Sequence, residues 1–565
     1  MTEKAVSSTE YFDAIVIGSG ATGGWAAKEL CERGLKTLVV DRGRMVEHIV
    51  DYDTDNKGKH ESPYRGDWPP GKQQEYRLAP TARPENYPFY ASDSEHPYVF
   101  DEEKPFVWIR PNIVGGKSIM WGRHCYRWSE QDFRANKVDG HGLDWPVRYN
   151  DIEPWYSHVE KVVGISGESL GLAQLPDSEF QPPMPMNILE KELRRVAACE
   201  FGGRVVTMGR VANLTEDMPQ NGRVRCQYRN QCHRGCRFGA YFSSQSTTLP
   251  LARKTGNLTL LSDRLVESLD YDASTGKVRS VRVVDTRTGR RETYRSKIVF
   301  LCASCIATNQ ILMNSKSEAM PNGLGNTHDQ LGRYVMDHIH GIRAVANFPG
   351  LHEEYVEYGR RPVGIYVPRF RNIDVGDRQR DFVRGYNYQG AASRNPPRDK
   401  GGFGAELKNQ LRIPGPWRLY LIGFGEVLPY RDNRMMLDER EVDTFGIPQM
   451  KFDVTWRENE RRMIEDMESE GVAMLRATGA DTVESNAVPS PPGQGIHEMG
   501  GACMGADPRT SIVNSRNQMH VAPNVYVTDG AFMSSGSCVN PTLTLMAFTA
   551  RAANHAADRL REGAI

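Results

Sequence analysis

The stretch from residue 13 to residue 41, DAIVIGSGATGGWAAKELCERGLKTLVVD, limits what this chain can fold into more than any other part of it. Its apolar run, Ala14 to Ile17, does not alternate with polar residues, which predicts a parallel strand buried on both faces. The run leads into a glycine turn and then a helix, which we expect to end near Gly34. A second strand is predicted from Thr37 to Val40. The order strand, turn, helix, strand is that of a parallel sheet with a crossover helix.

Three glycines and one acid in this stretch have the spacing of a nucleotide-binding turn. Gly18 permits the tight bend, Gly20 lets a pyrophosphate approach bare backbone, and Gly23 lets the helix pack against the strand. The helix N-terminus directs unpaired N–H groups at the anion. Asp41, at the end of the second strand, can accept hydrogen bonds from ribose hydroxyls. A chance glycine turn is the alternative, but the place between a strand and a helix favours a Rossmann-like nucleotide cradle.

Length and charge narrow the class of protein. A chain of 565 residues exceeds the usual size of one hydrophobic core, so we expect two domains or one domain with large insertions. The 71 basic and 71 acidic side chains cancel, which removes the broad attraction used to bind nucleic acid or anionic membranes. No run approaches the ~18 apolar residues of a spanning helix. We therefore expect no nucleic-acid partner and no direct membrane insertion.

The first residues and the cysteines bear on the compartment. The segment MTEKAVSSTEYFD is polar and contains acids, unlike a secretory signal peptide. The ten cysteines are mostly scattered, as suits a reducing compartment. We therefore expect a cytoplasmic protein, with the periplasm as the alternative if the chain is exported with a signal-bearing partner subunit.

The predicted elements divide the chain into two interleaved domains. Residues 51–105 are rich in proline and aromatic residues and predict an irregular segment, which either covers the active site as a lid or wraps the surface. Strand-like segments and a helix after residue 345 predict an antiparallel sheet with helices. We assign residues 1–50, 106–125, 250–345 and 488–565 to the nucleotide-binding domain and residues 126–249 and 346–487 to a substrate domain. The expected fold class is α/β.

A second glycine turn follows at residues 110–122, RPNIVGGKSIMWG. Gly115 and Gly116 precede Ser118 and Met120, so bare backbone and a small polar side chain meet in one turn. Such turns are common, but this one is a second candidate place where backbone contacts a cofactor.

Cys226, Cys232 and Cys236 lie close together in sequence, and this spacing places three sulfur atoms on one loop. One interpretation is three small structural residues. A zinc site needs four ligands, and only His233 or a distant residue could complete it. A three-iron iron–sulfur cluster needs only three thiolates, and a four-iron cluster could use His233 or Cys125 as an additional ligand.

Several motifs together indicate a family. The segments LGRYVMDH (331–338), HEMGGACMG (497–505), VYVTDGAF (525–532) and VNPTLT (539–544) resemble those of the glucose-methanol-choline (GMC) oxidoreductases. With the two glycine turns, the resemblance covers essentially the whole chain in the right order. The motifs HEMG and VNPTLT and the cysteine loop look most like the sugar-acting branch, which includes glucoside 3-dehydrogenases and the large subunits of sugar dehydrogenases.

The resemblance implies an FAD-binding domain and a substrate domain in the GMC fold. Met120 stands where pyranose oxidases have a histidine joined to the flavin, so FAD is expected to bind without a covalent link. Asp41 replaces the glutamate that is usual in the family. The expected cofactor-binding residues are Gly18, Gly20, Gly23, Asp41, Arg42, Gly115, Gly116, Ser118, Met120, Val266, Asp529, Gly530, Asn540 and Thr542.

His497 and Asn540 match the catalytic pair of the family. Oxidation of an alcohol removes a hydroxyl proton and a carbinol hydride, and imidazole titrates near operating pH, so His497 is the expected base. Asn540 can donate its amide N–H to the same oxygen but cannot act as a base. The alternative is two buried polar residues that are bonded to backbone.

The resemblance predicts FAD-dependent oxidation of a secondary hydroxyl of a sugar or glycoside, with C3 as the leading position, to a keto sugar. Electrons would pass through the iron–sulfur cluster to a small subunit and a one-electron acceptor such as a cytochrome c. The alternative is a pyranose-type oxidase that uses oxygen and has structural cysteines. A lyase and a non-enzymatic flavoprotein scaffold are the remaining interpretations.

Overall fold

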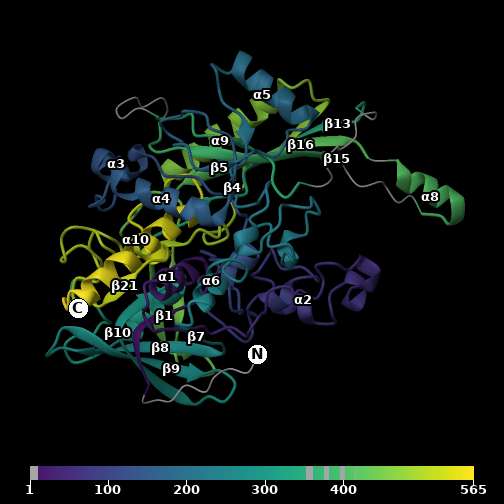
Figure 1. The fold of residues 1–565 in the computed structure, drawn as a ribbon. Coiled ribbons are helices and arrows are strands. Elements are labelled where there is room, and N and C mark those ends of the chain that lie inside the picture. Colours follow the sequence, from purple (N-terminus) through teal and green to yellow (C-terminus); the bar gives the residue numbers. More distant parts are fainter. Residues whose placement is uncertain (1–9, 352–360, 374–380, 395–400, 414) are drawn as a thin grey trace.

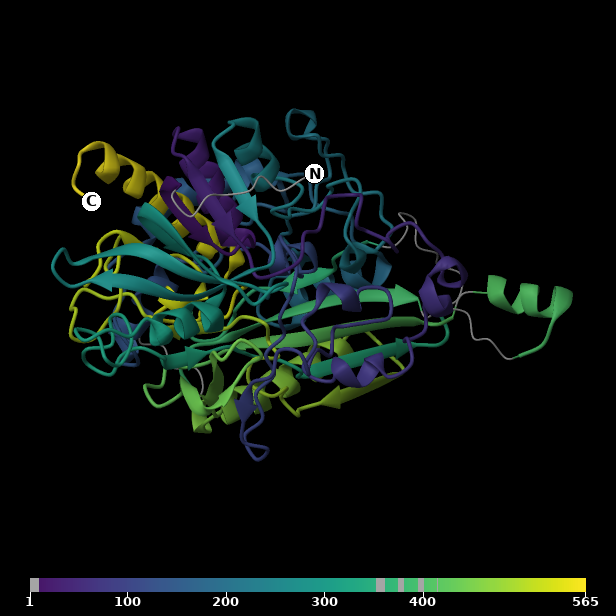
Figure 2. The same cartoon turned by 90° about the horizontal axis from the view of Figure 1, so that it is seen from below.

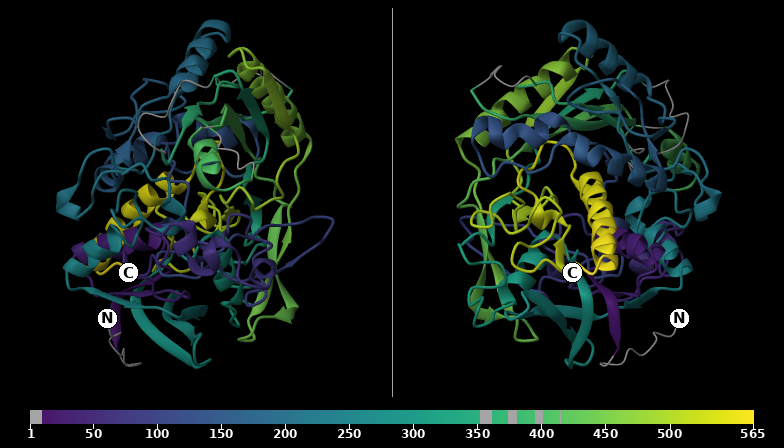
Figure 3. Two further views of the ribbon diagram at one scale, coloured as in Figure 1. Left: turned by 90° about the vertical axis from the view of Figure 1, so that its right-hand side faces the viewer. Right: turned by 60° about the vertical axis from the view of Figure 1, so that its left-hand side comes forward.

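The computed structural model describes residues 10–351, 361–373, 381–394, 401–413 and 415–565. Two large sheets lie at opposite ends of the molecule, here called the lower and the upper sheet as they stand in Figure 1. Helix α10 (Thr542–Arg561) starts between them and ends beside the lower sheet, as the side views of Figure 3 also show. The expected α/β fold with two sheet-based domains is confirmed.

The lower sheet contains the cradle predicted from the first stretch of sequence. Its strand order is β7-β2-β1-β10-β9-β8, and β21 pairs with β10. The pairs from β7 to β10 and the pair of β10 with β21 are parallel, whereas β8, β9 and β10 form an antiparallel meander. The strands are β1 (Tyr11–Ile17), β2 (Thr37–Val40), β7 (Leu258–Leu261), β8 (Arg264–Asp272), β9 (Lys277–Asp285), β10 (Arg291–Leu301) and β21 (Val525–Val527).

Helix α1 (Ala21–Glu32) begins at the first glycine turn and packs against α6 (Thr248–Lys254) and α10. Gly18 has φ +93°, and a Cβ there would lie 2.4 Å from the carbonyl oxygen of Cys302. A Cβ on Gly23 would lie 1.9 Å from the carbonyl oxygen of Gly18. Neither position tolerates a side chain, because the neighbouring atoms are backbone and cannot move aside.

The upper sheet is antiparallel, with strand order β19-β13-β16-β15-β14-β6, and β12 pairs with β16. Fully buried and half-buried residues alternate along most of β16, as expected for a sheet that is covered on one face. Helices α9 (Glu458–Arg476) and α5 (Ile188–Glu200) pack on the sheet and share one apolar core with it. The strands are β6 (Thr207–Met208), β12 (His338–Ile339), β13 (Arg343–Phe348), β14 (Ile365–Val367), β15 (Tyr386–Arg394), β16 (Trp417–Glu426) and β19 (Thr482–Asn486).

Shorter elements complete the fold. The small sheets are β17 (Arg434–Val442), β18 (Pro448–Asp453) and β3 (Val99–Phe100), then β11 (Arg333–Met336) with β20 (Met499–Gly501), then β4 (Ile165–Ser166) with β5 (Phe180–Gln181). The other helices are α2 (Lys72–Glu75), α3 (Glu130–Asp139), α4 (Tyr149–Val163), α7 (Cys305–Asn314) and α8 (Gly404–Arg412). Figures 1 and 2 show that α8 projects away from the body. In the described part of the chain, we find no helix with the length and apolar content that crossing a bilayer demands.

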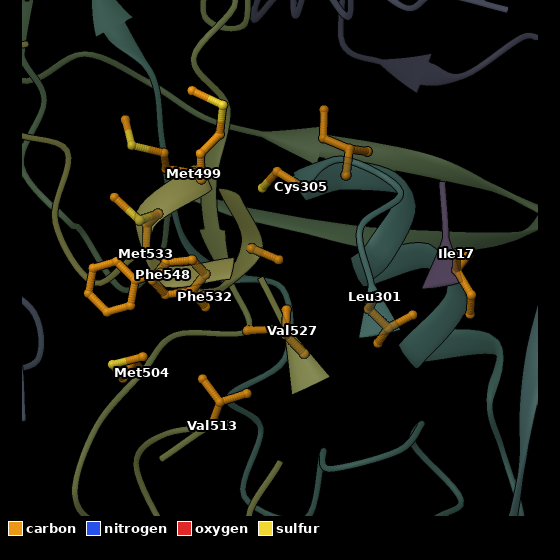
Figure 4. Close-up of a cluster of buried hydrophobic side chains, with 14 of the residues drawn as sticks. Ile17, Leu301, Cys305, Met499, Met504, Val513, Val527, Phe532, Met533 and Phe548 are labelled. Atoms are coloured by element: carbon orange, nitrogen blue, oxygen red, sulfur yellow. The ribbon is translucent and has the colours of Figure 1, made fainter. Parts of the chain in front are cut away.

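A core of buried side chains connects the lower sheet to the C-terminal part of the chain. Figure 4 shows part of this core, with Ile17, Leu301, Cys305, Met499, Met504, Val513, Val527, Phe532, Met533 and Phe548 labelled. Met499 is fully buried and lies two residues after His497. Burial of Met499 therefore anchors one end of the loop that carries His497.

One predicted domain boundary differs from the structure. We placed residues up to 345 in the nucleotide-binding domain, but β12 and the first residues of β13 belong to the upper sheet. The reason is that β12 contains only two residues, which is too short to show any alternation of apolar and polar side chains.

The segment 51–105 is irregular, as predicted, with short 3-10 turns and one short helix. It lies against the cysteine loop, where Arg237 pairs with Asp55 at 2.8 Å and Arg234 pairs with Glu85 at 3.1 Å. Among the described residues, the wall of the main cavity takes its side chains from outside this segment. The segment therefore covers the cysteine loop rather than the cavity.

We expect Gly364→Ala to destabilise the upper sheet. A Cβ at this position would lie 1.9 Å from the carbonyl oxygen of Gly390 on the neighbouring strand β15. Overpacking of this kind costs about 1–3 kcal/mol of unfolding free energy, which urea unfolding measures. Gly350→Ala is the control, because a Cβ there meets nothing within 4 Å. Equal urea midpoints for the two variants would contradict this account.

Candidate active site

A cavity of about 1390 Å³, its open mouth included, lies at the carboxyl ends of β1, β2 and β10. This is where open α/β sheets bind their ligands. The two glycine turns form the wall at one end of the cavity. At the other end the wall is formed by His497, Glu498 and the residues that start α10.

Both glycine turns offer bare backbone to the cavity. A Cβ on Gly116 would lie 3.3 Å from the Cα of Gly20, so the two turns face each other closely. A Cβ on Gly20 itself would meet no protein atom within 4 Å, so this backbone faces open space beside the first residue of α1. Backbone N–H groups at a helix N-terminus favour an anion in that space.

The carboxylate of Asp41 is buried in the cradle. One oxygen accepts hydrogen bonds from the amide of Ser19 at 2.9 Å and from the Ser19 hydroxyl, and the other accepts from the amide of Gly43 at 2.8 Å. Burial raises the pKa of Asp41, while these hydrogen bonds favour the ionised form. The Ser19 hydroxyl also accepts from the amide of Gly115 at 2.8 Å, so one side chain joins the two glycine turns. Sequence analysis missed Ser19, although its place inside the glycine turn was a signal.

Positive charge gathers at the cradle end of the cavity. Arg42 and Arg110 both line it, and burial together with the charge of Arg42 lowers the pKa of Arg110 to about 9. The Arg110 guanidinium lies over the ring of Trp108, 4.4 Å from its centroid. Arg110 is buried and Arg42 is half-buried, and two such guanidinium groups side by side are costly unless an anion lies with them. Together with the facing glycine turns, they fit the pyrophosphate of a dinucleotide such as FAD.

Most of the expected cofactor-binding residues line the cavity, namely Gly18, Gly20, Asp41, Arg42, Gly116, Ser118, Val266, Asp529, Gly530 and Thr542. The others lie behind or beside the wall. Gly23 packs beneath Gly18, the Gly115 amide donates to Ser19, and Met120 is half-buried at the end of the second glycine turn. Asn540 lies beside His497, directly before Pro541 and Thr542 of the wall. The binding role of each residue stays a prediction.

His497 lies at the opposite end of the cavity, on the segment between β19 and β20. The carboxylate of Asp337 holds the backbone of this segment, because it accepts from the amides of Gly495 at 2.8 Å and His497 at 3.0 Å. Burial and the charge of Glu498 raise the pKa of Asp337 to about 7. A Cβ on Gly495 would lie 2.5 Å from the same carboxylate, so a glycine is needed for this approach.

Asn540 contacts His497 from the start of α10. Its Nδ2 lies 3.3 Å from Nε2 of His497, so the structure brings the expected pair together. Burial, and then the charges of His338 and Lys117, lower the pKa of His497 well below its ordinary value, which leaves the imidazole neutral at neutral pH. A neutral imidazole can accept a proton while an amide N–H donates to the same oxygen.

Sequence analysis missed two residues at this end. Lys117 pairs with Glu498 at 2.6 Å, which ties the second glycine turn to the segment of His497. His338 has its Nδ1 2.8 Å from Nδ1 of His497. Each had a signal, because Lys117 lies inside the glycine turn and His338 ends one of the family motifs.

The three cysteines of the loop carry free thiols and are half-buried. Burial is the main reason that the pKa of Cys226 rises to about 11, and the charges of Cys232 and Cys236 add to it. Within the described residues, no three His, Cys, Asp or Glu side chains are arranged to hold a metal ion. The iron–sulfur cluster therefore has no preformed ligand group behind it and stays a prediction.

His233 and Cys125, the two residues suggested as additional cluster ligands, each contact other protein groups. Nε2 of His233 lies 3.5 Å from Nε of Arg234. Cys125 is fully buried in the core, and its amide donates to the carbonyl of Arg210.

Tyr241 interacts both with the cysteine loop and with the second glycine turn. Burial is the main cause of the raised pKa of Tyr241, and the thiols of Cys232 and Cys236 add to it. The Tyr241 hydroxyl donates to the carbonyl of Ile119, the last residue of a 3-10 turn whose earlier residues line the cavity. Tyr241 therefore connects the surroundings of the cysteine loop with a turn that lines the cavity.

Comparison with known proteins gives consistent results. Two family models described as GMC oxidoreductase match the chain, one over residues 12–340 and one over residues 429–549. A 2-methyl-1,2-propanediol dehydrogenase of Mycolicibacterium austroafricanum is 28% identical over 98% of this chain and 97% of its own. The fructose dehydrogenase large subunit of Gluconobacter japonicus is 24% identical, over 98% of each chain.

A solved structure supports the fold. Pyridoxine 4-oxidase from Mesorbium loti matches with a TM-score of 0.59 and 15% identity, over 96% of this chain and 98% of its own. At this identity the likeness shows the fold alone. With the family models, it confirms the resemblance stated from the motifs.

Proposed function

The chain belongs to the GMC oxidoreductase family, which makes it an FAD-dependent oxidoreductase of CH–OH groups, and we propose that its substrate is a sugar or glycoside. The proposed reaction oxidises a secondary hydroxyl, at C3 in the leading case, to a keto sugar. The observation that carries the proposal is the 3.3 Å contact between Nε2 of His497 and Nδ2 of Asn540, at the end of a cavity whose other end is a nucleotide cradle.

Two kinds of observation support a sugar-type alcohol. The relatives include enzymes named fructose dehydrogenase, paromamine 6'-oxidase and C-glycoside 3-oxidase. Beside His497, the ring of Phe424 lies 6.2 Å away between centroids, and His340 lies 4.9 Å from Phe424. Aromatic faces and convergent polar groups suit a ring that carries several hydroxyls.

The cradle residues fit FAD held without a covalent link. Gly20, Gly116, Arg42 and Arg110 would hold the pyrophosphate, and Asp41 would accept from the ribose. The chemistry that FAD supplies when bound is acceptance of the carbinol hydride.

The protein groups would handle the proton and the alcohol oxygen. Neutral His497 takes the hydroxyl proton at Nε2, and Asn540 donates an amide N–H to the same oxygen and orients it. Asp337 keeps the backbone of His497 in place through two amide hydrogen bonds. The N-terminus of α10, which begins at Thr542, favours negative charge in the cavity.

For electron exit, we propose an iron–sulfur cluster on Cys226, Cys232 and Cys236 that serves a small subunit and a one-electron acceptor such as a cytochrome c. The support is that the three thiols are half-buried and that two of them, Cys232 and Cys236, act on Tyr241, whose hydroxyl bonds to the second glycine turn. The relatives named fructose dehydrogenase large subunit and gluconate 2-dehydrogenase flavoprotein support a further subunit. For the compartment we propose the cytoplasm, or the periplasm if a signal-bearing partner exports the chain.

A second candidate is an oxidase that uses oxygen, with structural cysteines. It is favoured by the lack of a preformed metal-ligand group among the described residues. The relative named C-glycoside 3-oxidase from Microbacterium trichothecenolyticum, 21% identical over 97% of each chain, also favours it.

We expect His497→Ala to lower turnover about 10²–10⁴-fold, the usual loss for a general base, without loss of FAD. Activity is measured with D-glucose, D-fructose and methyl β-D-glucoside under the same conditions. The exposed His328 gives the control variant His328→Ala, which should behave as wild type.

Because burial lowers the pKa of His497, the base form persists in acid, so kcat/KM of wild type should fall only well below pH ~6.5. Near-normal turnover of His497→Ala would assign the base to another residue, and a flavin that none of the three sugars bleaches anaerobically would defeat the sugar proposal.

Acid or heat denaturation should release free FAD into the supernatant, since Met120 stands at the position of the covalent link. Absorbance and fluorescence of the supernatant measure it. Yellow colour that stays with the precipitated protein would show a covalent flavin.

Replacement of Cys226, Cys232 or Cys236 by Ser should abolish the cluster signal and electron delivery to cytochrome c. One anaerobic bleaching of the flavin by sugar should survive, because the cavity is untouched. Cys199→Ser, at an exposed free thiol, is the control. Iron analysis and the visible spectrum show whether the wild type and each variant contain the cluster. Iron-free wild-type protein with fast oxygen consumption would support the oxidase instead.

A further inference from the structure

A chain of hydrogen bonds runs through both proposed catalytic residues, and backbone sets its direction at one end. Nε2 of His338 lies 2.8 Å from the carbonyl oxygen of Ser537 and 3.3 Å from that of Gly536. A carbonyl oxygen only accepts, so this nitrogen carries the proton. Burial lowers the pKa of His338 to about 4, so the ring is neutral at neutral pH and its Nδ1 is a bare acceptor.

The tautomer of His338 determines that of His497. The two Nδ1 atoms are 2.8 Å apart, a distance at which one must donate to the other. Because Nδ1 of His338 accepts, Nδ1 of His497 carries the proton. Nε2 of His497 is left with its lone pair, as a base requires.

Gln389 extends the chain of hydrogen bonds beyond Asn540. Its Nε2 donates to Oδ1 of Asn540 at 2.8 Å, so the Asn540 amide presents Nδ2 to Nε2 of His497 at 3.3 Å. When substrate binds, its hydroxyl takes the place of this N–H at Nε2 of His497, and the amide can then donate to the substrate oxygen. If the amide were turned, its oxygen would face the lone pair of His497. Every link from Gln389 to the Ser537 carbonyl therefore donates in the same direction.

We propose that His338 and Gln389 are positioning residues that fix the tautomer of His497 and the amide orientation of Asn540. The inference rests on the proposed function, because it assigns roles relative to the proposed base. Both positioning residues belong to the upper sheet, His338 in β12 and Gln389 in β15. The upper sheet thus orients the base for proton transfer.

The Ser537 carbonyl, which ends the chain of hydrogen bonds, is held in place by further contacts. The Ser537 amide donates to Glu426 at 3.0 Å, and its hydroxyl donates to Asp132 at 2.8 Å. Glu426 pairs with Arg384 at 2.7 Å, and the two side chains are 1% and 2% exposed. The Ser537 carbonyl therefore cannot turn away from His338.

Three other titratable side chains besides His338 act on the pKa of His497. Lys117, His340 and His124 would each lower its pKa when charged. Lys117 is paired with Glu498, and the Asp337 carboxylate is bonded to backbone amides. Changes at residues 338 and 389 leave all of these groups in place.

The sharpest test reverses one link. In Gln389→Glu the introduced carboxylate only accepts, so Asn540 turns its oxygen toward His497. Gln389→Leu is the matched control, which removes the link without reversing it. With the fastest of the three sugars, we expect anaerobic flavin bleaching at pH 8 to slow at least about 10-fold further in Gln389→Glu than in Gln389→Leu, within the ~10⁴-fold that a misoriented base costs. The rate of Gln389→Glu should rise as the pH falls through the pKa of the introduced carboxyl, because the protonated group donates again.

A second pair of variants tests the tautomer. His338→Leu removes the acceptor, so His497 populates both tautomers, and we expect a loss of about 10-fold or more. His338→Asn supplies an amide oxygen near the place of Nδ1, and we expect it to recover most of the rate. Rates are expressed per bound FAD, and thermal melting checks the fold of each variant.

His497→Ala separates this inference from the proposed function. If that variant keeps its turnover, the proposed base is wrong and the inference falls with it. If it is inactive while Gln389→Glu and His338→Leu match wild type in rate and pH profile, the function stands and the inference is overturned. Should His338→Leu fail to fold, the two variants at residue 389 decide alone.

Discussion

The rest of the site depends on the hydroxyl of Ser19, which donates to Asp41 and accepts from the amide of Gly115. This one side chain holds two glycine turns together that are far apart in the sequence. The two turns form one end of the cavity wall, and backbone N–H groups bind an anion well only when they are held convergent. The second turn also places Lys117, which reaches across to Glu498 beside His497. The nucleotide end and the alcohol end of the cavity are therefore connected.

The alcohol end is assembled from four separate segments, each of which contributes one group: β12, β15, the segment before β20 and the start of α10. No single element could supply this geometry, because two of the groups come from strands of the upper sheet and two from segments outside it. The buried pair of Arg384 and Glu426 stabilises the junction by fixing the Ser537 backbone. A charge pair buried in this way contributes to orientation at least as much as to stability.

Local patterns predicted local structure well. The apolar run 14–17 lies in β1, and the second strand expected from Thr37 to Val40 is β2. Contacts between distant residues could not be predicted, because no periodicity encodes which loops meet. Lys117 and Glu498, and His338 and His497, are examples. The same limit applies to the cysteine loop, since spacing shows that three sulfur atoms share a loop but not whether they converge on one point. Motif resemblance, by contrast, identified the family and located His497 and Asn540 together.

The distribution of carboxylates explains how a buried histidine can remain a base. In a serine-protease triad a carboxylate faces the imidazole and stabilises its protonated form. Here the nearby carboxylates are bonded to other groups, Asp337 to backbone amides and Glu498 to Lys117. The neighbour of the His497 ring is instead the neutral imidazole of His338, which fixes a tautomer without adding negative charge. Burial then keeps the pKa of His497 low, so the lone pair stays available at the pH where an alcohol must lose its proton. Orientation and protonation state are thus controlled by separate groups, and neither requires a charge beside the reacting oxygen.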